Sequence, residues 1–301
     1  MGAPQWRKLV ACIAVALLSA CASQSTNIRH AHVHAARPSA PQLPFGGRTI
    51  LPGHRIVAYY GAAQTPDMGI LGHAPPDEIA PRLLRQARAY VPYGSRVAPA
   101  FELIATIAQQ SPGADGTYSM STDAKTIARY LQAVRAFHGL LILDIQPGRG
   151  SFLREARRYE PFLRKPDVEL ALDSEWSMEP TQVPAEVIGG TTGAVVNGVS
   201  SYLSSLVRRY NLPQKLLVVH EFAPFMVEHR NSIVDPPNVA IVFHVDGFGS
   251  RAAKLSKYRI LSQNRGKAFM GIKLFYTQDI DMFAASEVMK LRPQPALVTY
   301  Q

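Results

Sequence analysis

Residues 168–176 read V-E-L-A-L-D-S-E-W and place two carboxylates directly after a run of apolar residues. Successive side chains of a β-strand point to opposite faces, so Asp173 and Glu175 are expected to point the same way. Several other apolar runs of this chain also end in acidic or aromatic residues. The pattern predicts a set of buried strands that bring polar side chains to one common end.

Eight apolar runs have the length of buried strands, and helical patterns separate them. The predicted strands span residues 55–60, 97–104, 140–145, 168–172, 215–219, 239–245, 271–276 and 296–300. The predicted helices span residues 77–91, 123–137, 151–163, 194–210, 225–233, 250–264 and 284–291. Strands that are apolar throughout are typical of parallel sheets buried on both faces. Eight repeats favour the α/β class and a single (β/α)8 barrel, a TIM barrel, over residues 51–301. Its eighth helix is expected to be missing or replaced by the N-terminal segment.

The N-terminal residues have the pattern of a secretion signal, with two basic residues before an apolar run over residues 9–18. The following Leu-Ser-Ala-Cys resembles the lipobox of bacterial lipoproteins. That resemblance implies a signal peptide over residues 1–20, lipidation of Cys21 (palmitate among the acyl chains) and a flexible tether over residues 21–50. We then expect a monomer anchored in the cell envelope, on the extracytoplasmic side of a bacterial membrane. An ordinary signal peptide with a chance cysteine is the alternative.

The charge of the chain favours anionic partners but gives no sign of nucleic-acid binding. The formal net charge is +10 and the pI about 9.7. Basic residues are dispersed, and neither zinc-finger spacing nor an RNA-binding aromatic motif is present. The first predicted strand lacks a G-x-G-x-x-G after it, so a dinucleotide cofactor is not expected.

Active sites of (β/α)8 barrels lie at the C-terminal ends of the strands, and acidic residues recur at those positions here. Carboxylates together with aromatic rings suit sugar chemistry, in which one acid protonates the leaving oxygen and another acts as base or nucleophile. We predict Glu175, Asp173 and Glu221 as catalytic residues. The predicted substrate-binding residues are Tyr60, Glu102, Asp144, Trp176, His244, Asp246, Tyr276, Asp279 and Tyr300.

The fourth predicted strand resembles that of the chitinase-like family-18 glycosidases, which ends D-x-x-D-x-D-x-E. Asp173 and Glu175 match the last two acids, whereas Ala171 replaces the acid before them. The sequence F-H-V-D at residues 243–246 is similar to the family's M-x-Y-D. The first predicted strand, with A-Y-Y at residues 58–60, also resembles the family. The resemblance implies that Glu175 is the proton donor and Asp173 its pKa-tuning neighbour, acting on a polysaccharide.

Three classes of function remain open from the sequence. The first is a glycosidase in which Glu221 pairs with Glu175 or Asp173 across neighbouring strands. The second is an isomerase or phosphodiesterase that uses a divalent metal, although no cofactor is required by any motif. Its ligands would come from Glu102, Asp144, Asp173, Glu221, His244 and Asp246. The third is a non-catalytic lipoprotein that binds a glycan or a partner.

Overall fold

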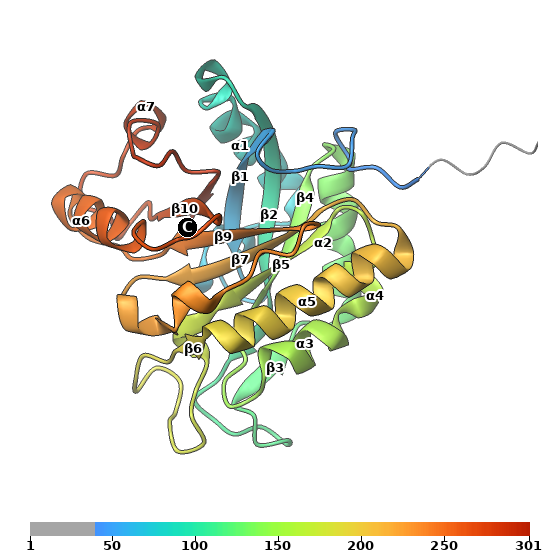
Figure 1. The fold of residues 1–301 in the computed structure, drawn as a ribbon, viewed down its shortest axis with the longest axis vertical. Helices are drawn as coiled ribbons and strands as arrows, with labels where there is room; N and C mark the ends of the chain where they lie inside the picture. Colours follow the sequence, from blue (N-terminus) through green and yellow to red (C-terminus); the bar gives the residue numbers. More distant parts are fainter. Residues whose placement is uncertain (1–39) are drawn as a thin grey trace, which may run out of the picture. The chain divides into compact units, whose positions relative to one another are not determined.

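The computed structural model describes residues 40–301, so the predicted signal peptide, Cys21 and residues 21–39 of the predicted tether lie outside the described residues. Residues 40–301 form one compact unit. No helix in this unit is long and apolar enough to cross a membrane. Its fold is a mixed α/β barrel (Figure 1).

Eight parallel strands form the barrel, and their order around it follows the chain. The strands are β1 (His54–Gly61), β2 (Arg96–Ala108), β4 (Leu140–Ile145), β5 (Val168–Asp173), β7 (Lys215–Glu221), β9 (Val239–Val245), β10 (Phe269–Leu274) and β11 (Leu297–Tyr300). Each strand pairs with the next, and β11 pairs with β1 to close the cylinder. The prediction of a closed (β/α)8 barrel is confirmed, with strand bounds within a few residues of those expected.

Short strands are also present besides the eight strands of the barrel. These are β3 (Ser119–Ser121), which runs antiparallel to β2, and β6 (Thr191–Thr192), which pairs with β8 (Val227–Glu228). The β6–β8 pair ties the loop after β5 to the loop after β7. Both of these loops lie at the C-terminal ends of the barrel strands.

Helices follow most strands and cover the outside of the cylinder. They are α1 (Pro76–Arg88), α2 (Ala124–Ala136), α3 (Phe152–Arg158), α4 (Glu160–Leu163), α5 (Gly193–Tyr210), α6 (Arg251–Leu261) and α7 (Ala285–Val288). Side-chain oxygens of Asp123, Ser151, Thr192 and Ser250 accept hydrogen bonds from backbone amides in the first turns of α2, α3, α5 and α6. Helices α3, α4 and α5 lie next to one another, as Figure 1 shows.

Two helix predictions differ from the structure. Residues 151–163 form two helices because Pro161, in the first turn of α4, has no N–H to continue the hydrogen bonding of α3. The helix predicted over residues 225–233 is wrong. That segment contains the 3₁₀ turns Pro224–Met226 and Arg230–Ser232 with β8 between them. His229 has a left-handed backbone (φ 51°), which interrupts any continuous helix there.

The apolar core has two layers. The larger layer lies between the outward faces of the strands and the helices, whereas a smaller one fills the barrel interior. The segment before β1 belongs to the inner layer, because Leu43, Ile50 and Leu51 are buried against the starts of the strands. Gln214, just before β7, accepts hydrogen bonds from the backbone amides of Ile50 and Leu51 at 2.8 and 3.0 Å. The N-terminal segment therefore closes the bottom of the barrel, and no helix follows β11 within the described residues.

Candidate active site

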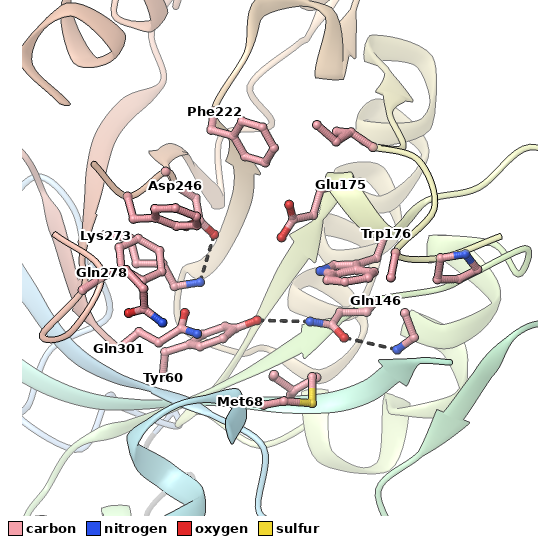
Figure 2. Close-up of a pocket in the computed structure, with 18 of the residues that line it drawn as sticks. Tyr60, Met68, Gln146, Glu175, Trp176, Phe222, Asp246, Lys273, Gln278 and Gln301 are labelled. Atoms are coloured by element: carbon pink, nitrogen blue, oxygen red, sulfur yellow. Dashed lines mark hydrogen bonds and ion pairs between the residues drawn. The ribbon is translucent and has the colours of Figure 1, made fainter. Parts of the chain in front are cut away.

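A pocket of about 660 Å³ opens at the C-terminal ends of the barrel strands (Figure 2). Its charged lining residues are Asp67, Glu175, Asp246, Lys257 and Lys273. Its aromatic lining residues are Tyr60, Trp176, Phe222, Phe248 and Phe275. Its amide lining residues are Gln109, Gln110, Gln146, Gln278 and Gln301. The pocket therefore combines apolar rings with neutral hydrogen-bonding groups and a small number of charges.

Glu175 is carried by the 3₁₀ turn Ser174–Trp176, which begins where β5 ends. Its backbone carbonyl accepts a hydrogen bond from Gly189 N at 2.7 Å, which ties the turn to the following loop. Figure 2 shows the carboxyl group pointing into the pocket, across from Asp246 and Lys273. Burial, together with the nearby Asp173 carboxylate, raises the pKa of Glu175 to about 8. Glu175 is therefore held as a neutral acid at neutral pH.

A hydrogen-bonded group of buried side chains forms the floor of the pocket. Tyr60 Oη lies 2.9 Å from Asp144 Oδ2 and 3.2 Å from Asp173 Oδ2. Gln146 Nε2 donates to Tyr60 Oη at 3.3 Å and to Asp173 Oδ2 at 3.2 Å. Burial is the main cause that raises the pKa of Asp144 to about 6 and that of Asp173 to about 7. The Oδ1 atoms of both aspartates have no hydrogen-bond partner within residues 40–301.

A chain of alternating charges runs through the barrel interior beside this group. Glu102 accepts a hydrogen bond from Thr299 Oγ1 at 2.9 Å, and its other oxygen lies 2.8 Å from His220 Nε2. His220 Nδ1 lies 3.1 Å from Asp246 Oδ2, which is also 2.9 Å from Lys273 Nζ. These four groups are a carboxylate, an imidazole, a second carboxylate and an ammonium group. They carry two negative and two positive charges when His220 is protonated.

The protonation states along this chain follow from its geometry. Burial alone would lower the pKa of His220, but Glu102 and Asp246 raise it well above its ordinary value. Although burial opposes ionisation, His220 lowers the pKa of Glu102 to about 2. Lys273 and His220 likewise lower the pKa of Asp246. Asp246 is therefore a stable carboxylate, in contrast to the neutral acid Glu175 on the other side of the pocket.

Lys273 was not predicted from the sequence, although it is central to the site. Its Nζ lies 3.4 Å from the centroid of the Tyr60 ring, a cation–π contact. Burial would lower the pKa of Lys273, but Asp246, Asp173 and Glu102 raise it. A lone lysine inside the apolar run of residues 271–276 was the signal that could have identified it. Lys273 acts as a counter-ion here, since a nucleophilic amine would need a lowered pKa.

His244 lies beneath the pocket and its side chain forms no hydrogen bond within the described residues. Its ring centroid is 4.8 Å from that of His220, and both of its ring nitrogens lack hydrogen-bond partners there. Burial and the neighbouring charge of His220 lower the pKa of His244 to about 3. A Cβ at Gly271 would lie 2.5 Å from His244 Cδ2, so glycine on β10 leaves the room that the ring occupies. His244 is therefore a neutral part of the barrel interior.

Asp173, His220 and Asp246 place one potential ligand atom each within 4.8 Å of one another. This is the one such group of three among residues 40–301. Asp173 and Asp246 belong to the metal ligands predicted from the sequence, whereas His220 does not. Both nitrogens of His220 already contact carboxylates, and Lys273 Nζ already neutralises Asp246. A metal ion would have to displace these contacts, so the donor set fits a resident cation poorly.

The predicted residues fall into three groups. Tyr60, Glu175, Trp176 and Asp246 line the pocket. Four others lie directly beneath it, buried in the barrel: Glu102, Asp144, Asp173 and His244. The remaining four do not line the pocket: Glu221, Tyr276, Asp279 and Tyr300.

The structure corrects the prediction that Glu221 faces the site. On β7 the residues Leu216, Val218 and His220 point into the barrel, so Glu221 points outward to the helix layer. There it forms an ion pair of 2.9 Å with Arg230. Burial raises the pKa of Glu221 to about 7. Glu221 and Glu175 therefore cannot act together on one bond.

The two tyrosines and Asp279 have other roles. Tyr300 points outward from β11, and its hydroxyl lies 2.6 Å from that of Tyr90. Tyr276 stacks on Tyr300 and lines a separate cavity. Asp279 accepts hydrogen bonds from the backbone amides of Phe275 and Gly249 and pairs with Lys254 at 3.0 Å. These residues hold loops in place at the rim of the barrel.

No protein-family model matches this chain, and no curated protein matches it.

Proposed function

We propose that this protein is a glycoside hydrolase-like enzyme that cleaves a polysaccharide by carboxylate acid/base catalysis. The observation that carries the proposal is the position of Glu175. Its carboxyl group points into the pocket beside the Trp176 ring and faces the carboxylate of Asp246. A neutral acid and a carboxylate on opposite sides of one pocket are the two groups that glycoside hydrolysis requires.

In this proposal Glu175 protonates the glycosidic oxygen as the bond to the anomeric carbon breaks. Asp246 faces the positive charge that develops on the sugar ring, either as a stabilising charge and base for water or as a nucleophile. Asp246 contacts both His220 and Lys273 through Oδ2, so its Oδ1 atom is not used in either contact. Asp173 raises the pKa of Glu175 and so keeps the proton donor loaded. This assignment replaces Glu221 by Asp246 as the second carboxylate.

The remainder of the pocket lining supports a sugar ligand. Trp176, Phe222 and Phe248 offer flat apolar surfaces of the kind that stack on sugar rings. The amide group of Gln146 is already bonded to Tyr60, Asp173 and Ala108 N. The other four lining glutamines carry amide groups that can donate to and accept from hydroxyl groups without adding charge. A neutral, hydroxyl-rich ring is the ligand class that this combination fits best.

The test is a screen of 4-nitrophenyl glycosides and cell-wall polysaccharides with the wild-type protein and the Glu175→Gln variant. We expect hydrolysis of at least one substrate by the wild type and a loss of about 10²–10⁴-fold in the variant. Binding that survives in Glu175→Gln, with no turnover by the wild type, would instead indicate a non-catalytic glycan-binding protein.

A metal-dependent enzyme is the second candidate, and it would have to use the group Asp173, His220 and Asp246 by displacing the contacts that Glu102 and Lys273 make there. Elemental analysis of the purified protein tests it directly. Stoichiometric Mg²⁺, Mn²⁺ or Zn²⁺ that is lost in an Asp246→Asn variant would favour that candidate over the glycosidase.

The place of action in the cell envelope remains a proposal based on the N-terminal sequence. We propose that lipid on Cys21 anchors the protein to the extracytoplasmic face of the membrane, where envelope polysaccharide is accessible. Labelling of growing cells with radioactive palmitate should mark the wild type and not a Cys21→Ser variant. Equal labelling of both proteins would contradict lipidation at this residue.

A further inference from the structure

The charged residues of the barrel are separated along its axis. The loops that lead from β1, β2, β4, β5, β9 and β10 to the next helix lie at the end that holds the pocket. They contain acidic residues such as Asp67, Glu179 and Asp281, and Arg149 is their one Lys or Arg residue. The connections that lead back into the strands, at the opposite end of the barrel, are mainly basic instead.

We call this opposite end the basic face. It is defined by exposed side chains that lie in these connections or directly beside them: Arg96, Arg164, Arg208, Arg209, Lys267 and Arg292. None of these side chains forms an ion pair with another residue of the 40–301 unit. The acidic residues of the same connections are Asp167 and Asp235, and Asp167 is already paired with Arg135. The basic face is therefore a cationic surface that is not neutralised within the described chain.

Helix dipoles explain only part of this pattern. The dipole of α5 favours cations in its last turn, where Arg208 and Arg209 lie. Arg96, Lys267 and Arg292 lie outside the helices, so no helix dipole favours a cation at these positions. The separation of charge between the two ends of the barrel therefore needs another explanation.

The described chain begins at the basic face. Arg48 donates hydrogen bonds to the carbonyl of Pro41 at 2.7 Å and to the carbonyl of Leu212 at 2.8 Å. Leu212 follows the last turn of α5, which carries Arg208 and Arg209. Figure 1 shows the first described residues close to this end of α5. Any attachment through the residues before Ala40 therefore acts on the barrel from the side of its basic face.

We propose that the basic face docks on an anionic lipid surface, the membrane that carries the lipid on Cys21. The proposal rests on the proposed lipid anchor and adds an electrostatic contact made by the barrel itself. Negative headgroups attract the basic face and repel the acidic loops around the pocket. The 21–39 segment spans at most about 65 Å, so the anchor keeps this face near the membrane. The pocket then opens away from the membrane, toward the envelope polymer.

The experiment measures membrane binding without the anchor, in the full-length Cys21→Ser protein. Sedimentation compares vesicles of phosphatidylcholine with vesicles that contain about one-third phosphatidylglycerol, at low and high salt. We expect binding to the anionic vesicles that exceeds binding to the neutral ones by more than about ten-fold and weakens at high salt. Arg164→Gln, Arg208→Gln and Arg209→Gln together should weaken it by about five-fold for each residue, on the order of 10²-fold in total.

The matched control removes the same charge from the other end of the helices, in the triple variant Arg82→Gln, Lys125→Gln and Arg154→Gln. These side chains are also exposed. The control should keep binding within about two-fold of the Cys21→Ser protein, because its charges lie further from the headgroups than a Debye length. Equal losses in the two triple variants would show that net charge alone governs binding, and would overturn the proposal.

The orientation is measured with one dye on a chain that also carries Cys12→Ser. The dye is attached either at Gln263→Cys, in the connection before β10, or at Ala114→Cys, in the loop after β2. Both positions are exposed, and energy transfer to acceptor dyes on the lipid headgroups should be greater from position 263. Equal or greater transfer from position 114 would contradict the proposed orientation.

Other results would also overturn the proposal. These are equal binding to neutral and anionic vesicles, no binding to either, or binding to the soluble uronate polymer hyaluronate without binding to anionic vesicles. The last result would assign the basic face to an acidic polysaccharide. Because the protein in this experiment carries no lipid on residue 21, its failure would leave lipidation and hydrolysis to be decided by their own tests.

Discussion

Lys273 Nζ lies 2.9 Å from Asp246 Oδ2, and both side chains are almost fully buried at the C-terminal end of the barrel. The lysine comes from β10 and the aspartate directly follows β9, so adjacent strands supply the pair. The ammonium group keeps Asp246 ionised in surroundings where burial alone would favour its neutral form. This ion pair keeps Asp246 ionised, whereas Glu175 is neutral at neutral pH.

Removal of the ammonium group should therefore impair both stability and activity. In Lys273→Met the pKa of Asp246 rises and a buried charge loses its partner, which costs about 3–5 kcal/mol. We expect that loss in urea unfolding, together with a fall in hydrolysis of about 10²-fold or more. Lys125→Met, an exposed change on α2, is the control and should alter neither quantity. A Lys273→Met protein with wild-type activity would rule out the counter-ion role.

The proton donor should show an unusually high pKa. Glu175 must be protonated to act, so activity should be retained below about pH 8 and fall as pH rises through its pKa. Carbon-13 NMR of carboxyl-labelled glutamate can follow this titration without a substrate, with Glu175→Gln used to assign the signal. Asp173→Asn removes the like charge and should lower the pKa, although burial should still keep it above the ordinary value of 4.5. A signal that titrates near 4.5 in the wild type would contradict the assignment.

Glu221 should be dispensable for catalysis, because it points away from the pocket and pairs with Arg230. We expect Glu221→Gln to keep activity within about two-fold, whereas Glu175→Gln loses about 10²–10⁴-fold. A large loss of activity in a folded Glu221→Gln protein would restore Glu221 as a catalytic candidate.

Glu221 should also affect the pH dependence of the protein's stability. Its folded-state pKa of about 7 exceeds the ordinary 4.5, so its stabilising contribution is present below pH 4.5 and is lost as pH rises through 7. Each pKa unit of difference between the folded and unfolded states corresponds to about 1.4 kcal/mol of unfolding free energy. Urea unfolding at pH 5 and pH 8 should therefore show a smaller pH-dependent loss in Glu221→Gln than in the wild type.

His220 and Glu102 should be energetically coupled, since they form a contact of 2.8 Å inside the barrel. His220→Leu leaves Glu102 and Asp246 without a shared partner and should cost about 3–5 kcal/mol. Combining it with Glu102→Gln should cost less than the sum of the two single changes, by about 0.5–3 kcal/mol. Denaturant unfolding of the four proteins measures this coupling, and strict additivity would show that the two residues do not stabilise each other.

The sequence by itself determined the alternation of strands and helices and the closed barrel, because burial on both faces produces apolar runs that are easily recognised. It also placed Asp173, Glu175 and Asp246 at strand ends, where a barrel collects its functional groups. The fourth predicted strand keeps this place as β5, and Glu175 does point into the pocket.

The tertiary structure decided which strand-end residues face the site. One position along a strand turns a side chain from the interior to the helix layer, so His220 faces inward whereas Glu221 faces outward, and Tyr300 faces outward beside Gln301. Local sequence predicts that residues alternate, but the packing of the barrel decides which of two alternating residues is inside. Charge balance was also decided in three dimensions, because Lys273 and Asp246 are distant in sequence and meet only where β9 and β10 pair.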